Sequence, residues 1–152
     1  MIHSLTIKIL SILILFGACS TQAYNDAEYF VSEKSKELNF PFSDASIVGN
    51  IIYVSGQVGS EPGTRKIVDG GINAETIQIL NNIEMILNDL GSNSDKIFKC
   101  LCMLEDINDY TEMNKAYTMF FNSRRNLPSR STFAGSGLAL GAKIEIECWA
   151  TK

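Results

Sequence analysis

Hydrophobic residues recur with helical spacing in two segments of the chain. From residue 73 to 90 they stand at every third or fourth position, and Gly91 follows where a helix C-terminal cap is expected. The apolar positions of this segment are Ile77, Leu80, Ile83, Leu87 and Leu90. A second helix, capped by Asp109, is predicted to carry one apolar face. That face holds Met113, Tyr117, Phe120 and Phe121. At 3.6 residues per turn, the first helix has about five turns.

Other segments carry the signals of β-strands. Two β-branched runs lie on either side of Gly49-Asn50, a pair suited to a hairpin turn. A loop with Pro62-Gly63 and Gly70-Gly71 follows over residues 58–71. Further strands are predicted at 97–104, 130–134 and 143–150. The order β-β-α-β-α-β-β predicts an α+β fold, a mixed sheet with both helices on one face.

The opposite face of that sheet is apolar as well. In the strand 97–104, Leu101 and Met103 point to one side. The other side is predicted to hold Phe98, Cys100, Cys102 and Leu104. A half-solvated sheet would alternate between apolar and polar residues. Because both helices already cover one face, we expect another copy of the chain to cover the second.

The N-terminal segment, residues 1–18, has the features of a secretory signal peptide. Lys8 precedes an apolar run over residues 9–16, which is too short to span a ~30 Å hydrocarbon layer, and small residues follow. Gly17-Ala18-Cys19 resembles the lipobox of bacterial lipoproteins, which makes Cys19 the expected lipidated first residue. With Ser20 next, the resemblance predicts an exported protein, periplasmic or anchored to the outer membrane. Residues 20–39 then form a spacer and first strand region, and residues 40–152 form the domain.

Composition and charge exclude several functions. The chain has 152 residues, 45% of them hydrophobic, which is typical of one globular domain. Its net charge of −4 offers no basic field for a nucleic acid. The single histidine is His3, inside the predicted signal peptide, so a mature chain has no imidazole for a Ser-His-Asp triad or a His-ligated metal.

Three cysteines belong to the predicted domain. Cys100 and Cys102 share one strand face, and Cys148 lies on another strand. Buried thiols of this kind are more often small hydrophobes than ligands, and three cysteines without histidine make a weak zinc site. In an oxidising compartment Cys148 could pair with either of the other two, and the sequence leaves that choice open.

Two carboxylates share a face of the last strand. Alternation puts Glu145 and Glu147 opposite Ile144 and Ile146. One interpretation is a solvated edge strand. The other is a buried carboxylate with a cationic partner, for which Arg130 on the neighbouring C-terminal strand is a candidate. We assign Tyr110 and Tyr117 to the core because of their helical spacing.

The chain resembles the RidA/YjgF family of reactive-imine deaminases over about residues 40–151. The matching motifs are Pro41-Phe42-Ser43, Gly49-Asn50, Val54-Ser55-Gly56-Gln57, Asn114 with Phe120-Phe121, Pro128-Ser129-Arg130-Ser131 and Ile144-Glu145-Ile146-Glu147. The resemblance implies a chorismate-mutase-like α+β subunit. It also implies a homotrimer with three sites in the clefts between subunits.

The resemblance further implies a reaction and its residues. Arg130 is expected to hold the substrate carboxylate, and Glu145 to contact the water that attacks the C=N carbon. The cleft lining is expected to include Phe42, Ser55, Gly56, Asn114 and Thr132. The implied reaction converts a 2-imino acid and water into a 2-oxo acid and ammonia, without a metal or organic cofactor. Phe42 stands where the family often has tyrosine, and Thr132 where it often has cysteine.

Two other functions are compatible with the same pattern. The chain could bind small carboxylates through Arg130 without activating water, or act as a holdase-like chaperone through exposed apolar surface. Ribonuclease activity, attributed to some members of the family, fits poorly with the negative charge and the lack of histidine. Export adds a condition for the enzyme, because an exported deaminase needs a source of imines outside the cytoplasm.

Overall fold

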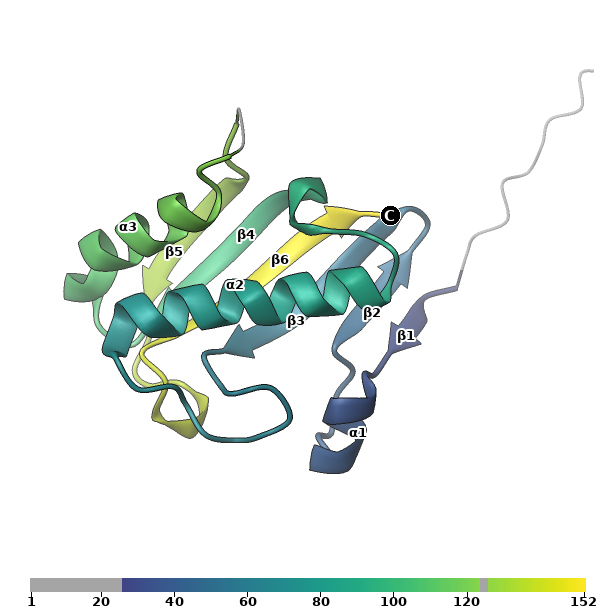
Figure 1. Cartoon of the computed structure of the whole chain (residues 1–152), viewed down its shortest axis with the longest axis horizontal. Coiled ribbons are helices and arrows are strands. Elements are labelled where there is room, and N and C mark those ends of the chain that lie inside the picture. Colours follow the sequence, from purple (N-terminus) through teal and green to yellow (C-terminus); the bar gives the residue numbers. More distant parts are fainter. Residues whose placement is uncertain (1–25, 124–125) are drawn as a thin grey trace, which may run out of the picture.

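The computed structural model describes residues 26–123 and 126–152, which form a six-stranded sheet and three α-helices (Figure 1). The strands are β1 (Glu28–Phe30), β2 (Ala45–Val48), β3 (Ile51–Val58), β4 (Ile97–Leu104), β5 (Ser129–Ala134) and β6 (Ile144–Thr151). The helices are α1 (Glu33–Leu38), α2 (Gly71–Asp89) and α3 (Tyr110–Phe120). The spatial order is β1-β2-β3-β6-β4-β5, and only β4 and β5 run parallel. The predicted α+β mixed sheet is confirmed.

Helices α2 and α3 lie on the same face of the sheet, as the sequence predicted (Figure 1). The core between α2 and the sheet is fully buried. It includes Ile52, Val54, Ile144 and Ile146 from the strands and Ile79, Leu80, Ile83 and Leu87 from α2. Burial of each such side chain contributes about 1.5–3 kcal/mol. This core determines which side chains of β3 and β6 point toward the helices and which point away from them. Gly56 lies on β3 and Glu145 on β6.

Local turn chemistry agrees with the sequence at two positions and differs at a third. Gly49 turns the β2–β3 hairpin with φ +60°, and Gly91 ends α2 with φ +76°. Both conformations favour glycine because at positive φ a Cβ would lie too close to the neighbouring backbone carbonyl oxygen. Asp109, in contrast, makes no capping hydrogen bond, which corrects the prediction. The backbone is already helical at Asp109, so the cap lies upstream at Asp106, whose side chain accepts the Asn108 N–H at 2.9 Å.

Before residue 40 the structure has a strand, in the segment expected to hold the first strand, and also a helix that the sequence pattern did not indicate. Strand β1 pairs with β2, and the short helix α1 follows it. The Asp44 carboxylate anchors α1 by accepting the Ser32 N–H and the Ser35 hydroxyl, each at 2.8 Å. A six-residue helix is too short to show a periodic apolar face. The predicted signal peptide and Cys19 lie outside the described residues, and no helix within the described ranges is long and apolar enough to cross a membrane.

Strand β4 contains an irregularity that alters the predicted faces. The register with β6 shifts between Ile97 and Lys99, so the alternation of side chains slips by one position. Phe98 therefore does not join Cys100 in the core as predicted. It is 42% exposed, and its ring centroid lies 6.5 Å from that of Trp149.

The structure resolves the open choice of cysteine pairing. Cys100 and Cys148 occupy directly opposed positions of β4 and β6 and form a buried disulfide. Cys102 stays a buried thiol, and burial raises its pKa to about 11. The bond joins two neighbouring strands in the middle of the sheet.

Candidate active site

Strand register separates the two residues expected to carry the chemistry. Met103 on β4 is paired with Glu145 on β6 and with Phe133 on β5. Paired residues lie on the same face, so Phe133 shares the face of Glu145. Side chains alternate along a strand and Arg130 is three residues before Phe133, so Arg130 lies on the opposite face. Strand β4 also lies between β5 and β6. The predicted ion pair between Arg130 and a β6 carboxylate within one chain is therefore wrong.

Arg130 lies on the helix-covered face, where α3 holds its guanidinium. Its Nη2 donates to Asn114 Oδ1 at 2.5 Å and to the Tyr110 hydroxyl at 3.4 Å. Its Cζ lies 4.7 Å from the centroid of the Tyr117 ring, within the range of a cation–π contact. Tyr110 is 40% exposed, which corrects its assignment to the core. Figure 1 shows α3 and β5 together at one edge of the sheet.

The surroundings of Arg130 are suited to an anion. The hydrogen bond with Asn114 and then the contacts with Arg130 lower the pKa of Tyr110. Thr132 shares the strand face of Arg130, and its buried Oγ1 has no hydrogen-bond partner among the described residues. A guanidinium can bind a carboxylate through two parallel hydrogen bonds. The residues Arg130, Asn114 and Thr132 therefore form one group, called here the arginine group.

Glu145 lies on the helix-free face beside a bulge in β3. Val54 pairs with Cys148 and Gln57 with Ile146, so two residues of β3, Ser55 and Gly56, oppose one residue of β6. This brings the Gly56 backbone against the Glu145 side chain. A Cβ at position 56 would collide with Glu145 Oε1, so glycine is what permits the close approach.

The electrostatic environment makes Glu145 a stronger base than an ordinary glutamate. Burial, and secondly the charge of Glu147, raises the pKa of Glu145. Glu147 itself accepts the Trp149 indole N–H at 2.6 Å. A carboxylate with a raised pKa is a better proton acceptor when ionised, which suits a residue that activates water.

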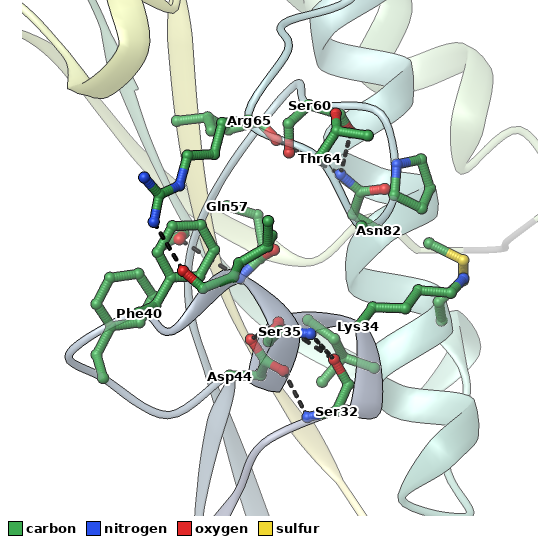
Figure 2. A pocket seen from close by; sticks show the side chains of 18 of the residues that line it. Ser32, Lys34, Ser35, Phe40, Asp44, Gln57, Ser60, Thr64, Arg65 and Asn82 are labelled. Carbon is green, nitrogen blue, oxygen red and sulfur yellow. Dashed lines mark hydrogen bonds between the residues drawn. The ribbon is translucent and has the colours of Figure 1, made fainter.

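Glu145, Gly56 and Phe42 line a cavity of about 790 Å³, shown in Figure 2. Helices α1 and α2 and the loop after β3 form its other sides. Ser55 does not line it, because its hydroxyl donates to the Ser43 carbonyl at 2.7 Å and ties down the loop that carries Phe42. The residues Glu145, Gly56 and Phe42 form a second group, called here the glutamate group.

Several residues around these groups were not singled out from the sequence. Phe40, Arg65 and Leu140 line the cavity from outside the strands and α-helices, where no periodic signal marks them. Two buried polar residues of α2 bond to the chain next to the strands. Glu75 accepts the Lys143 N–H just before β6 at 2.8 Å, and Asn82 donates to the Ser60 carbonyl just after β3 at 3.0 Å. Within residues 26–123 and 126–152, there is no group of three or more His, Cys, Asp or Glu residues that could hold a metal ion.

Comparisons with known proteins agree with this fold. Residues 34–152 match the family model described as endoribonuclease L-PSP. Over 107 residues the chain is 37% identical to the human 2-iminobutanoate/2-iminopropanoate deaminase, covering 70% of this chain and 77% of that protein. The chain belongs to the RidA/YjgF family.

Further RidA/YjgF proteins extend the similarity. The chloroplastic Reactive Intermediate Deaminase A of Arabidopsis thaliana is 35% identical over 137 residues, covering 90% of this chain and 72% of that protein. The crystal structure of the YjgF gene product of E. coli matches with a TM-score of 0.74 at 28% identity, covering 82% of this chain and 98% of that one. The fold implied by the family resemblance is confirmed.

Proposed function

We propose that this protein is a hydrolytic deaminase that converts 2-imino acids and water into 2-oxo acids and ammonia. Its relatives include proteins named 2-iminobutanoate/2-iminopropanoate deaminases at 36–37% identity. The observation that carries the proposal is that one chain holds both parts the reaction needs. These are a guanidinium placed for a carboxylate and a carboxylate with a raised pKa.

The residues have distinct roles in this reaction. Arg130 binds the substrate carboxylate through its guanidinium. Glu145 takes a proton from a water molecule whose oxygen forms a bond to the C=N carbon, and passes that proton to the nitrogen, which gives a carbon bearing a hydroxyl and an amino group. The hydroxyl proton then moves to the nitrogen through the same carboxylate, the C–N bond breaks as the C=O bond forms, and ammonia and the 2-oxo acid leave. Phe42 supplies an apolar wall, and Thr132 offers its hydroxyl near the bound carboxylate.

We also propose that each site forms between two copies of the chain in a homotrimer. The arginine group and the glutamate group lie on opposite faces of one sheet, so a single chain does not bring them together. Aromatic side chains on the helix-free face support association: Trp149 packs against Tyr53, and Phe133 is 49% exposed.

Mixed trimers test this arrangement. Arg130→Ala and Glu145→Gln chains with different tags are co-expressed, and trimers that contain both are purified through both tags. If Arg130 of one copy meets Glu145 of another, each mixed trimer has one intact site, and we expect about a third of wild-type activity. Trimers made from two differently tagged Arg130→Ala chains are the control and should stay inactive. Mixed trimers no more active than this control would contradict sites between copies.

Export and lipidation at Cys19 are a further proposal. The N-terminal pattern of Lys8, an apolar run and a lipobox-like Cys19 supports it. The buried Cys100–Cys148 disulfide supports it independently, because such bonds persist in oxidising compartments and are rare in the cytosol. Imines produced by amino-acid oxidation in the cell envelope would then be the substrates.

Cell fractionation tests this location. Wild-type protein is expected in the membrane fraction and Cys19→Ala protein in a soluble fraction, with Cys102→Ala as the cysteine control. Wild-type protein found entirely in the cytosol would refute both export and lipidation.

A further inference from the structure

The cavity beside Glu145 is larger than the smallest substrates need. Its volume of about 790 Å³ lies in the range of sites for whole drug-sized ligands, roughly 300–1,000 Å³. The imino acids named for the relatives carry only one or two carbons beyond the reacting carbon. Such side chains would leave most of the cavity unfilled.

One wall of the cavity is a stack of aromatic rings. Phe40 and Phe42 lie 5.1 Å apart at an interplanar angle of 9°. Arg65 holds the stack, since its Cζ lies 5.3 Å from the Phe40 centroid and its Nη2 donates to the Leu38 carbonyl at 2.7 Å. Figure 2 shows Arg65 and Phe40 together on this side. Phe42 is 52% exposed and lines the same cavity as Glu145.

Apolar side chains from other elements also line the cavity. They include Met85 and Ile86 of α2 and Leu140. Two polar residues that line the cavity are already bonded within the protein. Asp44 accepts hydrogen bonds from α1, and Asn82 donates to the Ser60 carbonyl. A bound apolar side chain would therefore leave these polar groups satisfied.

We propose that this cavity is a side-chain subsite for 2-imino acids with an aromatic side chain, and that Arg65 positions its aromatic wall. The proposal rests on the deaminase function, because the reacting carbon must stand at Glu145 while the side chain enters the cavity. A substrate ring extends the Phe40–Phe42 stack in the offset arrangement that aromatic rings prefer. Met85 lines the same cavity, and a thioether makes favourable contacts with aromatic rings.

Competing substrates test the subsite. An amino-acid oxidase generates the imines of phenylalanine and alanine, and 2-oxo acid release is followed with and without the purified protein. We expect kcat/KM for the phenylalanine imine to exceed that for the alanine imine at least about tenfold, the discrimination typical of an apolar pocket. Equal or lower kcat/KM for the phenylalanine imine would overturn the subsite and leave the deaminase function intact. No acceleration of either imine would overturn both.

Variants locate the preference in the cavity. Met85→Trp fills the cavity from α2 and should lower the phenylalanine-to-alanine ratio of kcat/KM about tenfold. Arg65→Ala should lower the same ratio by raising KM for the phenylalanine imine, and Arg65→Lys should restore part of it. Lys96→Ala, at an exposed residue that does not line the cavity, is the control and should leave the ratio unchanged. A ratio unaffected by both Met85→Trp and Arg65→Ala would place the preference elsewhere and refute the proposal.

Discussion

The arginine group and the glutamate group are held in place by different means. Arg130 is positioned by direct contacts with α3, which include Asn114, Tyr110 and the sulfur of Met113. Glu145 is positioned by shape, because the bulge in β3 and the missing Cβ of Gly56 make room for its carboxylate. A group that binds an anion benefits from a fixed geometry. A group that must take up and release a proton benefits from partial burial, which raises its pKa.

The largest expected effect comes from removing the charge of Glu145. Glu145→Gln should lower kcat about 10²- to 10⁴-fold, because the variant has no base to activate water. Binding of a 2-oxo acid, measured by calorimetry, should remain because Arg130 is unchanged. Arg130→Ala should lose both the binding of the 2-oxo acid and turnover, because the guanidinium that holds the carboxylate is missing. Full turnover in Glu145→Gln would show that the carboxylate is not the base. Loss of 2-oxo acid binding in Glu145→Gln would contradict the assignment of binding to Arg130 and of water activation to Glu145.

A smaller effect is expected from closing the space beside Gly56. The Cβ of Gly56→Ala should displace the Glu145 carboxylate and lower kcat/KM about 10²-fold, as a shift of about 1 Å can do. Gly135→Ala is the matched control, since a Cβ there meets no atom within 4 Å. If both variants retained wild-type kcat/KM, the close approach of Gly56 to Glu145 would have no role in catalysis.

The disulfide links the strands on which both groups depend. Cys100 is paired in register with Arg130, and Cys148 lies on the strand of Glu145. The bond closes a sequence separation of 48 residues, for which the chain-entropy model gives about 4 kcal/mol of stability. Chemical denaturation of a Cys100→Ala/Cys148→Ala variant should show a loss of that order, and Cys102→Ala a smaller one. Equal losses in the two variants would mean that packing, rather than the cross-link, accounts for the effect.

The smallest effect concerns the pH dependence of the reaction. The pKa of Glu145 is raised, so on acidification its carboxylate takes up a proton at a higher pH than an ordinary glutamate does. Because only the ionised carboxylate can accept a proton from water, activity should begin to fall at that higher pH. Glu147→Gln removes the neighbouring charge, lowers the pKa of Glu145 and should move the acid limb of kcat/KM to lower pH. The profile is measured after subtraction of uncatalysed hydrolysis. A limb that does not move, or moves to higher pH, would contradict the coupling of the two carboxylates.

Much of the fold follows from local patterns along the chain. The apolar faces of α2 and α3, the Gly49 turn and the Gly91 helix end all depend on residues close together in sequence. Alternation likewise places Ile144 and Ile146 inside and Glu145 outside. Helix α1 has too few residues for such a pattern. Alternation does not predict the positions of Phe98 and Gly56, because an irregularity in each strand shifts it by one residue. No residue pattern in the sequence indicates where these shifts occur.

The family motifs identified the residues of the candidate site, but not how they are distributed over the fold. Alternation along a strand assigns each side chain to a face and says nothing about which strand lies alongside. Strand pairing joins segments far apart in the sequence. It inserts β4 between β5 and β6, separates Arg130 from Glu145, and sets Cys148 opposite Cys100 rather than Cys102. These long-range pairings depend on how the whole sheet packs against its helices, so they are present only in the folded chain.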